Sequence, residues 1–155
     1  MLLRTDKRRA TAAVELAICM PFLLIVVFGI WEVGRMVQAQ QLVANAARDG
    51  GRQVASGLAD STSVRQFVVN YLNMNGLTGV SLSDVTLTNI TNAARSDPMT
   101  ANQLDQFRVT VTVSYASIRW STVAQITPTT AITASADWYS MRDLPVTVSS
   151  TIPTN

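Results

Sequence analysis

The stretch RRATAAVELAICMPFLLIVVFGIWEVGR, residues 8 to 35, decides the fold of this chain. Its apolar run, counted from Ala12, reaches the roughly 20 residues that a helix needs to span a bilayer. One carboxylate, Glu15, lies inside the run. Because a charge at bilayer depth is costly, an acidic residue in such a segment is by default a candidate functional residue.

Charge is distributed unevenly on the two sides of this run. The residues before it are mostly basic: Arg4, Lys7, Arg8 and Arg9, against Asp6. From Glu32 onward, arginines and acidic residues are equal in number. This asymmetry follows the positive-inside rule, so we expect a cytoplasmic N-terminus and the body of the chain across the membrane. The body has no basic patch, and no nucleic-acid partner is predicted.

The composition argues against most enzyme chemistry. The chain has no histidine, and its single cysteine, Cys19, lies inside the apolar run. The usual general base and the usual metal ligand are therefore missing, and no disulfide framework is available. No metalloprotease motif or glycine-rich phosphate loop occurs either. We therefore predict no enzyme activity, no catalytic residue, no metal site and no cofactor.

A basic leader before an apolar run has three possible processing fates. The helix can remain as an uncleaved signal anchor, or a secretory signal peptide can end at Val37-Gln38-Ala39. The second fate is disfavoured because Glu32 and Arg35 separate that site from the apolar run. In the third fate the cut falls before Thr11, which makes Glu15 the fifth residue of the mature chain.

Glu15 itself has two interpretations. When membrane helices bundle, its carboxylate can meet a neighbour's free α-amino group, and such a pair in a low-dielectric setting fixes axial register. Alternatively, the carboxylate lies near the lipid head groups, protonated or solvated, and has no role.

The helix is predicted to continue past the membrane to Gly57. Small and apolar residues recur at three- and four-residue spacing: Met36, Ala39, Val43, Ala47, Gly50 and Val54. This amphipathic stripe can pack on the protein's own sheet, which we favour, or on a partner helix. Gly50-Gly51 weakens the helix and is a candidate point for its end or a bend.

The remaining sequence predicts an α+β fold with a second, short helix and a small antiparallel sheet of about three strands. The short helix begins after Asp60 to Thr62, ends at Gly76, and has an apolar face made by Val64, Phe67, Val68, Tyr71 and Leu72. The strands are expected at residues 85–90, 107–115 and 131–138. The resulting layout has five parts: basic leader 1–10, transmembrane helix 11–31, amphipathic extension 32–57, exported α+β domain 58–143 and extended tail 144–155.

Several motifs in the first third of the chain resemble a known family. They are Ala-Val-Glu-Leu-Ala at 13 to 17, Pro21, Gly-Ile-Trp-Glu-Val-Gly-Arg at 29 to 35 and Asn-Ala-Ala-Arg-Asp-Gly-Gly-Arg at 45 to 52. Together they resemble the TadE-like family, bacterial pseudopilins or minor pilins of tight-adherence (Flp) type IV pilus systems. The resemblance covers roughly residues 8 to 57.

The resemblance implies a pilin-like fold and a defined place in the cell. A prepilin peptidase would cut between Ala10 and Thr11, although alanine stands where the family usually has glycine and Leu16 replaces a frequent aromatic. Glu15 would then act in assembly with other pilins or pseudopilins and the Tad inner-membrane machinery. The protein would be single-pass in the inner membrane, with a periplasmic or extracellular C-terminal domain that can join the pilus.

The alternative function is an uncleaved, signal-anchored envelope protein whose exported domain binds a ligand or partner. The first residue of the mature protein separates the two hypotheses, because only the pseudopilin begins at Thr11.

Overall fold

The structure, a computed structural model, describes the backbone of residues 3–114 and 131–142 and the side chains from Ala10 onward within those ranges. The chain divides into two units, Met1–Gln38 and Ala39–Asn155. One helix, α1 (Leu3–Ser56), contributes to both units. The predicted tail, residues 144–155, lies outside the described residues.

The first unit consists of the N-terminal part of α1. Every side chain described from Ala10 to Trp31 is exposed, including large apolar ones such as Phe22 and Ile25. Pro21 lies within the helix. Among the described residues, one helix is long and apolar enough to cross a membrane, and its candidate segment begins at Ala10. An apolar surface of this kind is stable only in contact with lipid or with other apolar surfaces.

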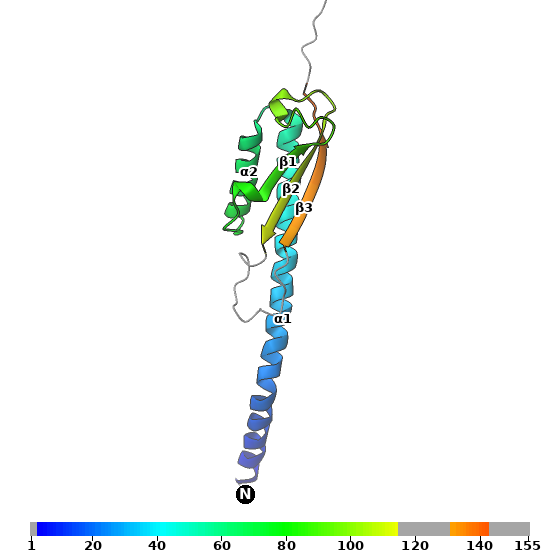
Figure 1. Cartoon of the computed structure of the whole chain (residues 1–155). Helices are drawn as coiled ribbons and strands as arrows, with labels where there is room; N and C mark the ends of the chain where they lie inside the picture. Colours follow the sequence, from blue (N-terminus) through cyan, green and yellow to red (C-terminus); the bar gives the residue numbers. More distant parts are fainter. Residues whose placement is uncertain (1–2, 115–130, 143–155) are drawn as a thin grey trace, which may run out of the picture. The chain divides into compact units, whose positions relative to one another are not determined.

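The second unit is built on a three-stranded antiparallel sheet (Figure 1). Its strands are β1 (Val85–Asn89), β2 (Gln106–Ser114) and β3 (Ala131–Tyr139), in the order β1-β2-β3. The register places Val85 opposite Val111 and Val113 opposite Ile132. The predicted α+β class and the three predicted strands are therefore confirmed, with ends that differ by one residue.

One face of the sheet forms the core of this unit. Residues alternate along each strand, and the buried inward positions are apolar apart from Asn89: Val85, Leu87, Phe107, Val109, Val111, Val113 and Ile132. Threonine and serine dominate the opposite face. This two-residue period is what a half-buried strand requires, and it explains why the sheet was readable in the sequence.

The second helix, α2 (Ser61–Met74), follows α1 after a short turn. The Asp60 side chain caps it by accepting a hydrogen bond from the Ser63 amide at 3.2 Å. The buried residues are Val64, Val68, Val69 and Leu72. The predicted apolar face was wrong at Phe67, which is 38% exposed. Because each residue turns the helix by about 100°, the burial of Val69 moves the centre of the face away from Phe67.

The C-terminal part of α1 lies against both α2 and the sheet. Ala39, Val43, Ala47, Gly50 and Val54 of the amphipathic stripe are buried within the second unit. The helix continues through Gly50-Gly51, so these glycines do not end it. The stripe thus packs on the protein's own elements, which was the favoured of its two interpretations.

The two glycines allow three elements to approach closely. A Cβ atom on Gly50 would lie 2.6 Å from Val68 Cγ2 of α2 and 3.5 Å from Val109 Cγ1 of β2. A Cβ atom on Gly51 would lie 2.0 Å from Cδ1 of Trp138 on β3. Both positions therefore exclude any side chain.

The connection between β1 and β2 is held by two buried polar side chains. Asn89 donates to the carbonyl of Arg95 at 2.8 Å and to the Asp105 carboxylate at 3.2 Å. Asp105 in turn accepts from the Asn102 amide at 2.9 Å. The short 3₁₀ turns η1 (Leu82–Asp84) and η2 (Pro98–Thr100) complete the loops. Buried polar groups with satisfied hydrogen bonds fix a loop in one conformation.

We expect Gly51→Ala to lower the free energy of unfolding of the second unit by about 1–3 kcal/mol, because the indole of Trp138 must move. This loss exceeds the gain in helix propensity, which is at most about 1 kcal/mol. Thermal unfolding followed by tryptophan fluorescence measures the change. Gly34→Ala is the matched control, since nothing lies within 4 Å of a Cβ atom there. Equal unfolding midpoints for the two variants would contradict the packing described here.

Candidate functional site

The apolar part of α1 contains the residues to which the sequence assigned a function. Thr11 and Glu15 are four residues apart in an uninterrupted helix, so they share one face. The Glu15 side chain is exposed, and its neighbours Val14 and Leu16 are exposed apolar residues. In contact with lipid, this carboxylate would have no water to hydrate its charge. A cationic partner on a neighbouring helix would stabilise it.

The peptide bond between Ala10 and Thr11 lies about two turns inside α1, which begins at Leu3. Its backbone groups therefore take part in the helical hydrogen-bond ladder. A peptidase that cuts at this bond has to open the helix locally. The side chains of Ala10 and Thr11 are both exposed.

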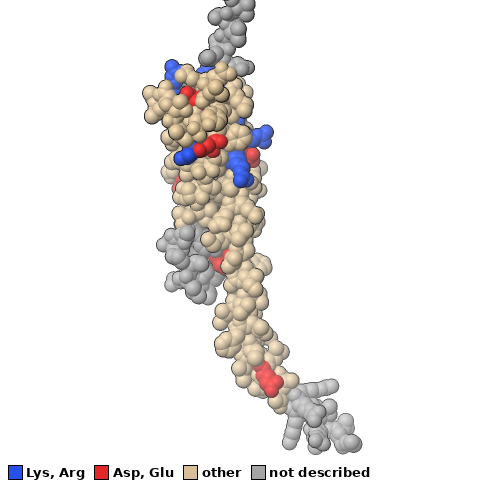
Figure 2. Space-filling model, turned by 90° about the vertical axis from the view of Figure 1, so that its right-hand side faces the viewer, with Lys and Arg blue, Asp and Glu red and all other residues tan. Residues whose placement is uncertain are grey.

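Charge is rare in the apolar segment of the first unit, residues 10–31. On the face in view, Figure 2 shows few coloured atoms on the described part of the first unit, and those are red; blue and red atoms gather on the second unit. Between Ala10 and Trp31, Glu15 is the only charged residue. The site is therefore a single carboxylate in an otherwise uncharged segment of α1, residues 10–31.

A shallow groove lies in the second unit between α1 and α2. Asp49, Arg52, Gln53 and Ser56 line it from α1, and Phe67 lines it from α2. We call it the Phe67 groove. Asp49 is half-buried, and the other four side chains are exposed. The sequence alone did not show that an aromatic ring from α2 lies beside Asp49 and Arg52.

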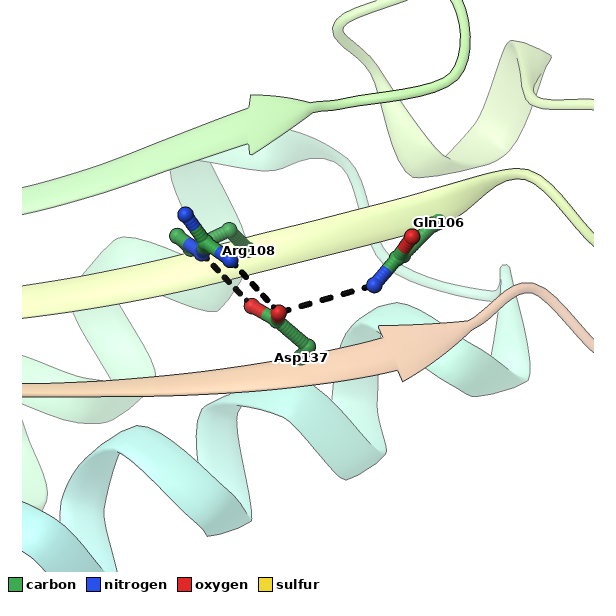
Figure 3. A network of polar contacts seen from close by, with 3 residues as sticks. All are labelled: Gln106, Arg108 and Asp137. Carbon is green, nitrogen blue, oxygen red and sulfur yellow. Dashed lines mark hydrogen bonds and ion pairs between the residues drawn. The ribbon is translucent and has the colours of Figure 1, made fainter.

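The exposed face of the sheet contains one polar network (Figure 3). Arg108 on β2 and Asp137 on β3 are directly opposite in the register. The guanidinium donates from Nε to Oδ1 and from Nη2 to Oδ2, each at 2.7 Å. Gln106 donates weakly to the same carboxylate, at 3.5 Å. These hydrogen bonds from Arg108, and its positive charge, lower the pKa of Asp137.

This network joins β2 and β3 across the exposed face of the sheet. Bidentate pairing aligns the two strands, and the sequence could not reveal it because the pairing depends on the register between β2 and β3. In the part of the chain with described side chains, no three acidic or cysteine residues come together as metal ligands.

We expect the Arg108–Asp137 pair to make stability depend on pH. Because the folded pKa of Asp137 lies below its ordinary value of 3.8, the pair stabilises the fold above that value. The contribution is lost as the pH falls through the lower folded pKa. Asp137→Asn should therefore lower the unfolding midpoint slightly at neutral pH and reduce its loss between about pH 4 and pH 2.

Arg108→Gln serves as the control. If the two side chains act only through their pairing, Asp137→Asn, Arg108→Gln and the double variant should show the same pH dependence of the unfolding midpoint. An unchanged acid profile in Asp137→Asn would show that the pair contributes nothing.

Comparison with known proteins identifies the N-terminal part of the chain. Residues 10–52 match the family described as TadE-like protein. No curated protein and no solved structure matches the chain. The match begins at Ala10, contains Glu15 and the apolar run, and ends at Arg52, an exposed residue of α1 in the second unit. The resemblance seen in the sequence is thereby confirmed, and the chain carries a TadE-like segment over residues 10–52.

Proposed function

We infer that this protein is a membrane-inserted pseudopilin, or minor pilin, that takes part in the assembly of a Flp-type (Tad) type IV pilus. The observation that carries this proposal is the TadE-like match over residues 10–52, which begins with an exposed apolar segment, residues 10–31, that contains one carboxylate. The pilin-like order of elements, a long helix followed by a small antiparallel sheet, agrees with it. The protein works by assembling with partners and performs no catalysis.

In this proposal the basic leader is cytoplasmic and is removed by a prepilin peptidase between Ala10 and Thr11. The apolar helix stays in the inner membrane, and the second unit is exported. The partners are the peptidase, other pilins or pseudopilins, the Tad inner-membrane machinery and the lipid bilayer. The positive leader and the balanced charge of the body support this orientation.

Glu15 has a specific role in the assembly step. Cleavage would create an α-amino group on Thr11, one helical turn from Glu15 on the same face. A helix of this kind presents a cation and an anion side by side, so neighbouring helices can pair them across the bundle when their axial offset is correct. Outside the bundle, the carboxylate remains in a lipid setting that disfavours its charge. Glu15 would thus favour the assembled state over the dispersed one.

We expect the mature protein, purified from its native membrane, to begin at Thr11 when its N-terminus is sequenced. Ala10→Gly should be processed at least as completely as the natural chain, because glycine is the smaller residue. Ala10→Trp should accumulate uncut, because its indole is too large for a site built for a small residue.

Ala13→Trp is the matched control, since it places the same ring on the mature side of the bond. An intact leader in the natural protein would instead indicate the permanently anchored envelope protein. A chain that begins after Ala39 would indicate a secreted domain and contradict both hypotheses.

We expect Glu15→Gln to enter the membrane and lose its leader normally but to join pilus complexes at least tenfold less. A tenfold change corresponds to about 1.4 kcal/mol, which is modest for the loss of an ion pair in low dielectric. Co-purification with the pilus fraction, quantified relative to the membrane pool, measures the effect.

Glu32→Gln is the control, because it neutralises a carboxylate on the same helix beyond the apolar run. Normal incorporation of Glu15→Gln would refute the assembly role of this residue.

A further inference from the structure

The Phe67 groove has features that the fold of the second unit does not need. Phe67 leaves 38% of its surface exposed, although the sequence pattern had placed it in the core. Within residues 10–114 and 131–142, the side chains of Asp49 and Arg52 form no hydrogen bond or ion pair. A half-buried carboxylate with no partner among these residues has lost part of its hydration without compensation from them.

The two charges make the groove complementary to itself. Asp49 and Arg52 have opposite charge and lie three residues apart on α1, an axial separation of about 4.5 Å. If a second copy lies beside the first with its helix parallel, each Asp49 comes diagonally opposite the other copy's Arg52. Two reciprocal ion pairs then form across one interface, which is the pattern of a two-fold contact.

The membrane anchor restricts the symmetry of such a pair. Two copies held in one bilayer with their N-termini on the same side have parallel apolar segments. A two-fold axis along the membrane normal preserves this arrangement, whereas an axis in the membrane plane would place the two apolar segments on opposite sides. Reciprocal pairing of Asp49 and Arg52 is therefore compatible with anchoring.

We propose that a second copy of this chain docks on the Phe67 groove and that its Asp49 and Arg52 pair with Arg52 and Asp49 of the first. The two Phe67 rings close the apolar centre of the contact, and the polar side chains of Gln53 and Ser56 form its rim. An aromatic centre with a polar rim is the usual anatomy of a specific interface. The charges supply the register and exclude unsuitable partners. The inference rests on the membrane anchoring within the proposed function, and it requires neither cleavage after Ala10 nor the pilus machinery.

The test uses two differently tagged full-length copies, co-expressed in a host without a prepilin peptidase or a Tad system. One copy is captured from gently solubilised membranes, and the second is quantified. Asp49→Arg paired with itself, and Arg52→Asp paired with itself, should each reduce capture at least tenfold, because like charges then face one another. Asp49→Arg co-expressed with Arg52→Asp should restore capture, since every diagonal pair is again complementary.

Three further variants complete the test. The double variant Asp49→Arg/Arg52→Asp should associate with itself, and Phe67→Ser should weaken every combination. Arg48→Asp is the matched control: it reverses an exposed charge on the same helix outside the groove and should leave capture unchanged. Unfolding midpoints measured in parallel verify that each variant is folded.

Two results would overturn the proposal. One is that natural copies do not capture one another. The other is that Asp49→Arg co-expressed with Arg52→Asp is captured no more than either variant paired with itself. Because the host lacks the pilus system, a failure here is distinct from a failure of cleavage or of Glu15-dependent assembly.

Discussion

The close approach of α1, α2 and the sheet at Gly50 and Gly51 is the constraint on which the second unit depends. A Cβ atom at either position would collide with Val68 or Trp138. The absence of two side chains brings Val43, Ala47 and Val54 within reach of the inward faces of α2 and the sheet. Glycine weakens a helix in isolation, and here the packing of three elements offsets that cost. The same helix is then free to present an exposed apolar surface in its first half.

Much of this fold could be predicted because each element repeats a simple pattern. Alternation from Phe107 to Val113 indicated β2, and Asp60 with Gly76 marked the two ends of α2. The apolar run could also be recognised from the sequence alone, and Glu15 was a candidate site residue because it is the only charged residue within that run. These signals are local, and local signals survive in the sequence without knowledge of tertiary contacts.

The features that escaped prediction depend on contacts between elements. Phe67 fits the apolar period of α2, yet the helix is rotated so that Val69 is buried in its place. The Arg108–Asp137 pair requires the register of two strands, and the Phe67 groove requires α1 and α2 to lie side by side. A glycine pair that permits close packing resembles, in sequence, a pair that ends a helix. Only the neighbours of Gly51 distinguish the two cases.

The division of α1 has a mechanical consequence. Every buried apolar side chain described lies at Ala39 or later, so the core contains nothing from the apolar segment. If the apolar segment is inserted in a bilayer, a force that draws it out works against lipid contacts and removes no described side chain from the core of the second unit. Extraction and unfolding are then separate events with separate barriers. A chain built in this way can exchange the surroundings of its first unit while its second unit stays folded.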